Sequence, residues 1–109
     1  MYKGLRVAVV VPAYNEADHL PSTLATIPTY VDHVLVVDDG SVDETSSVAA
    51  CHARPGVEVL RHLENRGVGA AVATGYRRAL SLNSDVAVVM AGTHAMLDHL
   101  LRVLLRQTA

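Results

Sequence analysis

Four short apolar runs divide the chain at similar intervals, at residues 5–11, 34–37, 57–60 and 86–90. Each run is almost continuously apolar rather than alternating, which is typical of a strand covered on both faces. Each is followed by polar or glycine-containing residues, which indicate a loop. The pattern therefore predicts four buried parallel strands whose carboxyl ends meet at one edge of a sheet.

The segments after the four runs carry apolar residues at helical spacing. In the second segment, Ser41 and Glu44 have the spacing of a capping box, so a helix is expected to begin there. In the fourth, leucines predict a final amphipathic helix over residues 97–105. The other helical positions are Leu20, Leu24 and Ile27 in the first segment, and Ala70, Ala71, Ala73, Ala79 and Leu80 in the third.

The predicted element order is βαβαβαβα, in a single α/β domain over residues 1–109. Connections of this length imply right-handed crossovers, and we expect a Rossmann-like three-layer sandwich with strand order 3-2-1-4. This order puts the topological switch between strands one and four, where open α/β sheets bind ligands. Loops 12–16 and 91–95 should therefore face each other across a crevice, with loop 38–41 at its side.

Composition narrows the classes of function. The net charge is -2 and no basic run is present, which argues against nucleic acid as a partner. Cys51 is the only cysteine, so a disulfide framework is excluded and a reducing, cytoplasmic location is expected. Because no apolar stretch approaches about 18 residues, no transmembrane segment is expected.

Two acidic positions adjoin the predicted crevice. Asp38 and Asp39 directly follow a strand, where carboxylates can accept hydrogen bonds from a ribose or from a base N–H. Alternatively, they cap the next helix and accept N–H groups of the turn, and spacing alone favours this second interpretation. Glu16 can likewise bind a ligand hydroxyl or cap the helix that follows it.

Two weaker signals are open to ordinary structural explanations. Gly67 and Gly69 begin a helix, where they could hold a phosphate, but a close approach of helix to strand is the favoured explanation. His94 is the only one of six histidines in the presumed crevice. A solvated loop residue is the favoured interpretation of His94, ahead of a metal ligand.

Four segments together resemble the nucleotide-sugar half of the family 2 glycosyltransferases, which have the GT-A fold. They are VVVPAYNEADHL at 9–20, VLVVDDGSVDET at 34–45, NRGVGAAVATGYRRAL at 65–80 and SDVAVVMAG at 84–92. Within the family, the sequence is most similar to the polyprenyl-phosphate sugar transferases, the group of dolichyl-phosphate mannosyltransferase. The resemblance covers nearly the whole chain.

The resemblance implies binding of a nucleoside-diphosphate sugar together with Mg²⁺ or Mn²⁺. It also implies transfer of the sugar to a polyprenyl phosphate or another acceptor. By the family pattern, Pro12, Tyr14 and Glu16 would line the nucleoside pocket, Val37 and Asp39 would contact the base, Asp38 would support that loop, and Ala91 and Gly92 would approach the ribose and diphosphate.

The sequence departs from the family after the fourth apolar run. The family has an acidic motif there, whose last Asp binds the metal and is often helped by a Gln two residues later. Thr93 and Ala95 occupy these positions in this chain. A hard cation requires anionic oxygen ligands, so no metal site is expected among these residues.

The family's catalytic domain also extends much further, so the chain is expected to be inactive alone. The alternatives are a non-catalytic, truncated relative that binds a nucleotide or only oligomerises, and an unrelated small Rossmann-like module. Without later strands, strand four would be an apolar edge that invites pairing. We therefore expect a homo-oligomer formed through strand four and the last helix. The sequence leaves open whether the cytoplasmic chain also contacts a membrane surface.

Overall fold

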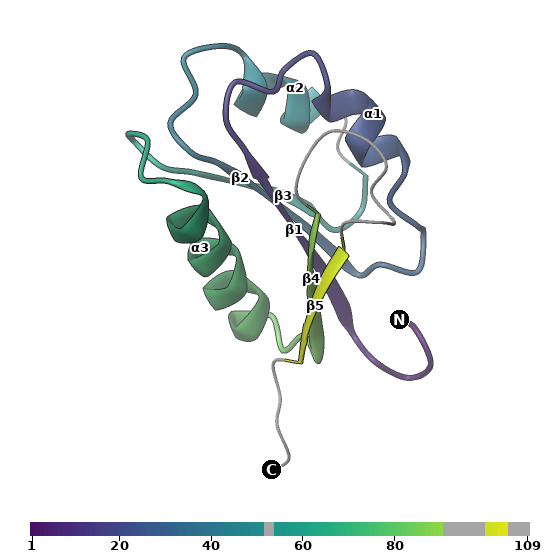
Figure 1. Cartoon of the computed structure of the whole chain (residues 1–109). Helices are drawn as coiled ribbons and strands as arrows, with labels where there is room; N and C mark the ends of the chain where they lie inside the picture. Colours follow the sequence, from purple (N-terminus) through teal and green to yellow (C-terminus); the bar gives the residue numbers. More distant parts are fainter. Residues whose placement is uncertain (52–53, 91–99, 105–109) are drawn as a thin grey trace.

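A computed structural model describes residues 1–51, 54–90 and 100–104. A single sheet has the strand order β3-β2-β1-β4-β5 (Figure 1). The elements are β1 (Val7–Ala13), α1 (Leu20–Ala25), β2 (His33–Asp38), α2 (Thr45–Cys51), β3 (Val57–Arg61), α3 (Val68–Ser81), β4 (Val86–Met90) and β5 (Leu100–Leu104).

The four strands β1 to β4 are parallel and have the expected order 3-2-1-4. The central strand β1 pairs with β2 on one side and with β4 on the other. Its apolar residues are buried on both faces, which explains the absence of polar alternation in its sequence. The carboxyl ends of β1, β2 and β3 therefore lie at one edge, where their loops meet.

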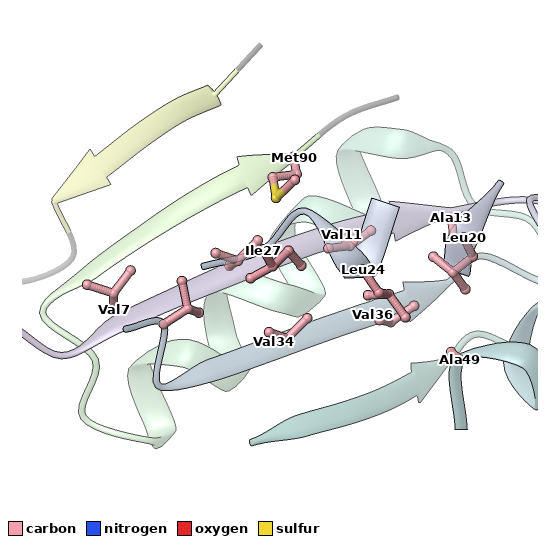
Figure 2. Packing of buried hydrophobic residues seen from close by; sticks show 12 residues of the cluster. Val7, Val11, Ala13, Leu20, Leu24, Ile27, Val34, Val36, Ala49 and Met90 are labelled. Carbon is pink, nitrogen blue, oxygen red and sulfur yellow. The ribbon is translucent and has the colours of Figure 1, made fainter. Parts of the chain in front are cut away.

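The sheet is the middle of three layers, with α1 and α2 on one face and α3 on the other (Figure 1). Alternate residues of β1 point into two separate cores. Val9 and Val11 pack towards α1, and Val10 packs towards α3. Figure 2 shows Val11 beside Leu24 of α1 in the first of these cores. This arrangement confirms the predicted Rossmann-like three-layer sandwich.

The close approach of α3 to the sheet depends on Gly75, not on Gly67 and Gly69 as the sequence suggested. A Cβ on Gly75 would overlap Val10 Cγ1, whereas a Cβ on Gly67 or Gly69 would have nothing within 4 Å. Gly67 precedes the helix and Gly69 lies in its first turn, so neither lies over β1. At 14 residues α3 is the longest described helix, and no helix in this part of the chain could cross a membrane.

The helix predicted to begin at Ser41 begins at Thr45 instead. The Ser41 hydroxyl accepts a hydrogen bond from the backbone N–H of Asn15, so it is used between loops rather than as a cap. The Thr45 backbone N–H donates to Asp43 Oδ1 at 3.0 Å. The capping box was therefore a wrong prediction, because neighbouring loops compete for the same hydroxyl.

The final predicted helix is also wrong over residues 100–104, which form the antiparallel strand β5. Met90 of β4 lies opposite Leu100, and Val86 opposite Leu104. A short apolar run suits a strand as well as a helix, and the open side of β4 offers it backbone hydrogen bonds. Strand β4 is therefore not an edge, and the expected homo-oligomer loses both surfaces on which it was based. Residues 97–99 and 105 lie outside the described residues.

Candidate functional site

The loops that follow β1 and β2 are joined by hydrogen bonds from backbone N–H groups to side-chain oxygens. The Asn15 N–H donates to Ser41 Oγ at 2.8 Å, and the Val42 N–H donates back to Asn15 Oδ1 at 3.0 Å. The Glu16 N–H donates to Thr45 Oγ1 at 2.9 Å. Asn15 has a φ of 53°, a left-handed conformation that asparagine tolerates better than most residues. These bonds fix both loops against each other at the carboxyl ends of β1 and β2.

Asp38 is fully buried at the end of β2, and its carboxylate is used within the protein. The Ser41 N–H donates to Oδ1 at 2.9 Å, and the Ser46 hydroxyl donates to Oδ2. Arg61, at the end of β3, places Nη1 3.3 Å from Oδ2 and donates through Nη2 to the Ser41 carbonyl at 3.1 Å. Asp38 thus holds its own loop and ties it to β3.

Asp39 reaches in the other direction, towards the loop between β3 and α3. Oδ1 accepts from the Arg66 N–H at 2.9 Å, and Oδ2 accepts from the Gly67 N–H at 2.8 Å. His62 Nδ1 lies 2.7 Å from Oδ1. Burial raises the pKa of Asp39, but the hydrogen bonds from His62, Arg66 and Gly67 outweigh burial and lower the net pKa. Asp39 is therefore an ionised acceptor with a fixed orientation.

Backbone contact completes the junction of these loops. Gly40 has a φ of +76°, and a Cβ there would lie 2.5 Å from the Asn65 backbone nitrogen. The His62 N–H donates to the Asp38 carbonyl at 2.9 Å, which extends the β2–β3 ladder one residue past β3. Three loops therefore form one connected rim around the carboxyl ends of β1, β2 and β3.

His62 is the residue that sequence reasoning missed, since His94 alone was considered as a ligand. His62 is 8% exposed, and its Nε2 lies 2.8 Å from Thr74 Oγ1 of α3. The register supplies a signal that could have found it. Asp38 pairs with Arg61, so the next residues along the parallel strands, Asp39 and His62, must be neighbours.

The other expected residues differ in their accessibility. Tyr14 is 45% exposed, and Glu16 is half-buried with no hydrogen bond from its carboxylate to any described residue. Pro12 is half-buried next to Val37 in the ladder. Val37 is fully buried in the core towards α3, so its side chain is not available to a base. Tyr14 and Glu16 are thus the accessible members of the set, whereas Asp39 is 4% exposed and Asp38 is fully buried.

The fourth wall of the expected crevice falls outside the described residues. Ala91, Gly92, Thr93, His94 and Ala95 therefore remain sequence predictions. Their donor set has one hydroxyl and one imidazole but no carboxylate, which does not fit Mg²⁺ or Mn²⁺. Among residues 1–51 and 54–90, no group of three or more His, Cys, Asp or Glu side chains could hold a metal ion either.

Comparison with solved structures finds the same fold in sugar transferases. A mannosyltransferase from Pyrobaculum calidifontis, in complex with GDP-Man and Mn²⁺, superposes with a TM-score of 0.69 at 31% identity, over 80% of this chain and 27% of that one. Glucosyl-3-phosphoglycerate synthase from Mycobacterium tuberculosis, with Mn²⁺ and UDP, gives a TM-score of 0.62 at 25% identity, over 81% of this chain and 33% of that one.

Curated sequence relatives agree. A dolichyl-phosphate beta-glucosyltransferase of Drosophila melanogaster is 41% identical, over 73% of this chain and 29% of its own length. An undecaprenyl-phosphate mannosyltransferase of Micrococcus luteus is 40% identical, over 79% of this chain and 37% of its own length. The chain thus spans about a third of these relatives. The model of the family described as glycosyl transferase family 2 matches residues 8–103. The chain belongs to glycosyl transferase family 2.

Proposed function

We propose that this domain binds the nucleoside part of a nucleoside-diphosphate sugar at the rim formed by the three loops. The observation that carries this proposal is the ionised Asp39 carboxylate, held by Arg66, Gly67 and His62 at the carboxyl ends of the parallel strands. Open α/β sheets bind ligands at this edge. The complexes of two structural relatives with GDP-Man and with UDP support the same ligand class.

The chemistry of these residues suits a nucleoside. An ionised carboxylate only accepts hydrogen bonds, so Asp39 favours a base that offers an N–H group. The carboxylate of Glu16 is free among the described residues to accept from a ribose hydroxyl, and Tyr14 offers an exposed ring to stack on a base. In this proposal Pro12 lines the pocket, the main chain at Val37 supports it, and Ala91 and Gly92 approach the ribose and diphosphate.

We further propose that the 109 residues do not transfer the sugar alone. A divalent cation, when bound, neutralises charge on the leaving diphosphate, but positions 91–95 lack the carboxylate to hold it. Transfer to a polyprenyl phosphate at a membrane surface is the activity proposed for a complete protein. The second candidate is a non-catalytic relative that binds nucleotide or forms oligomers, and the missing carboxylate at position 93 favours it over an active enzyme.

The test is calorimetric titration of UDP and of GDP into the purified chain, with and without Mn²⁺. Binding of at least one nucleotide without metal, unchanged by Mn²⁺, is the expected result. Glu16→Gln should weaken this binding while leaving the unfolding midpoint unchanged, because no described residue depends on its carboxylate. Failure of both nucleotides to bind in either condition would refute nucleotide binding, and a requirement for Mn²⁺ would refute the loss of the metal site.

A further inference from the structure

The side chain of His62 is held between two loops and a helix. Its Nδ1 lies 2.7 Å from Asp39 Oδ1, and its Nε2 lies 2.8 Å from Thr74 Oγ1. A carboxylate can only accept, so Nδ1 carries the proton in this pair. Both ring nitrogens therefore have a fixed partner, and the imidazole plane has one favoured orientation.

This orientation controls what remains available on Asp39. Oδ1 already accepts from His62 and from the Arg66 N–H, whereas Oδ2 accepts only from the Gly67 N–H among the described residues. A carboxylate oxygen can accept about two hydrogen bonds. The free acceptor capacity is thus concentrated on Oδ2, which is the atom left for a ligand N–H.

We infer that Thr74, His62 and Asp39 form a positioning relay, in which α3 sets the direction of the Asp39 carboxylate that reads the base. This inference rests on the proposed nucleotide function and extends it to two residues outside the predicted pocket. In this inference His62 acts only through its hydrogen bond to Asp39, so it is a positioning residue.

The cationic side chain of Arg61 is directed to groups other than the Asp39 carboxylate, so it does not orient that carboxylate in place of His62. Arg61 directs its guanidinium to Asp38 Oδ2 and to the Ser41 carbonyl, so it does not compensate Asp39. The two backbone donors, from Arg66 and Gly67, come from one loop and bind one carboxylate oxygen each. The link to helix α3 runs through His62 and Thr74, which ties the base-reading group to a 14-residue helix packed on the sheet.

The experiment compares two ligands in each variant: the nucleotide that binds, UDP or GDP, and the same nucleotide methylated at the base N–H. In the unsubstituted chain the parent should bind more tightly than the methylated form. His62→Leu should lower affinity for the parent about tenfold, the size of one charge-assisted hydrogen bond. It should change affinity for the methylated nucleotide less than about twofold. A purely structural role would weaken both equally.

Three further variants make the result specific. His62→Asn places an amide N–H near the Nδ1 position and should restore most of the discrimination. Thr74→Val keeps the side-chain volume, removes the Nε2 partner, and should cost about threefold for the parent alone. His33→Asn, at the start of β2 and far from the loops, should leave both affinities unchanged.

Two outcomes would overturn the relay: equal losses for the two nucleotides, or no recovery in His62→Asn. If His62→Leu does not fold, the Thr74→Val and His62→Asn comparisons decide the question in the same way. A failure of the unsubstituted chain to bind either nucleotide would instead refute the proposed function, and with it the role of the relay towards a ligand. The two failures are therefore distinguishable.

Discussion

Gly40 lies against the backbone of Asn65, so that a Cβ on Gly40 would lie 2.5 Å from the Asn65 backbone nitrogen. This contact joins the loop after β2 to the loop after β3, the same two loops that Asp39 and His62 join through their side chains. The DDG sequence therefore combines an acidic ligand candidate with the one residue type that allows its neighbouring loop to approach.

Replacing Gly40 with alanine should destabilise the fold by about 3 kcal/mol, the sum of left-handed strain and overlap with the backbone. Gly4 is a matched control, with a φ of +79° and nothing within 4 Å of a Cβ. Gly4→Ala should therefore cost only about 1 kcal/mol, from the strain alone. Urea unfolding of the two variants measures the difference. Equal losses would show that the contact with Asn65 is not limiting.

Because Gly75 lies against Val10, we expect a substitution at Val10 to offset the loss of stability caused by a substitution at Gly75. Alanine is favoured over glycine in a helix by about 1 kcal/mol, but at position 75 the overlap with Val10 should outweigh this and give a net loss of about 1–3 kcal/mol. Val10→Ala should make room, so Gly75→Ala should cost much less in that background. Gly69→Ala, in the open first turn of α3, should be neutral or stabilising. A double-mutant cycle by chemical unfolding that shows no coupling would contradict the predicted overlap.

Asp39 predicts a pH dependence of stability. Its pKa in the folded chain lies below the ordinary value of 3.8, because hydrogen bonds from His62 and two backbone groups outweigh burial. The stabilisation from Asp39 is then fully present above that ordinary value and is lost as the pH falls through the folded-state pKa. The unfolding free energies of the unsubstituted chain and of Asp39→Asn should differ at about pH 6, and the difference should shrink only as the pH falls below 3.8 towards the folded-state pKa.

Asp43 provides the comparison for this titration. Its pKa is also lowered, chiefly by the hydrogen bond from the Thr45 hydroxyl, but its side chain is exposed. Asp43→Asn should therefore change the same pH window by less, because water screens an exposed carboxylate. A larger effect at Asp43 than at Asp39 would be inconsistent with the buried network described for Asp39.

A metal site should be recoverable by two substitutions. Thr93→Asp with Ala95→Gln would supply an anionic ligand and an amide at the positions where the resemblance places them. Isothermal titration with Mn²⁺ in the presence of nucleotide should show metal binding in the double variant and none in the unsubstituted chain. Thr93→Asn with Ala95→Gln is the uncharged control. Equal Mn²⁺ affinity in all three proteins would refute the alignment of Thr93 with the metal Asp.

The strand order and the meeting of the loops after β1 and β2 could be predicted from the sequence because they follow from continuous apolar runs and the rules of parallel connection. The prediction failed where two structures compete for the same residues. Residues 100–104 are apolar enough for a helix or a strand, and the open side of β4 decided the outcome. Ser41 could cap a helix or bind another loop, and Asn15 decided it.

The role of His62 was missed for a different reason. Its sequence neighbours Arg61 and Leu63 are both exposed, Leu63 to 98%, so nothing local marks His62 as buried. Its environment arises from Asp39 and Thr74, which are distant along the chain. Pairwise register, rather than periodicity within one segment, carries that information.

The antiparallel pairing of β5 with β4 bears on how much the sequence between these two strands can change. Because Leu100 lies opposite Met90, the residues that flank positions 91–99 in the sequence pair with each other in the antiparallel ladder. Insertions, deletions or substitutions at those positions need not shift any strand register. The register of β4 and β5, and with it this side of the sheet, is therefore compatible with different lengths and sequences between Met90 and Leu100.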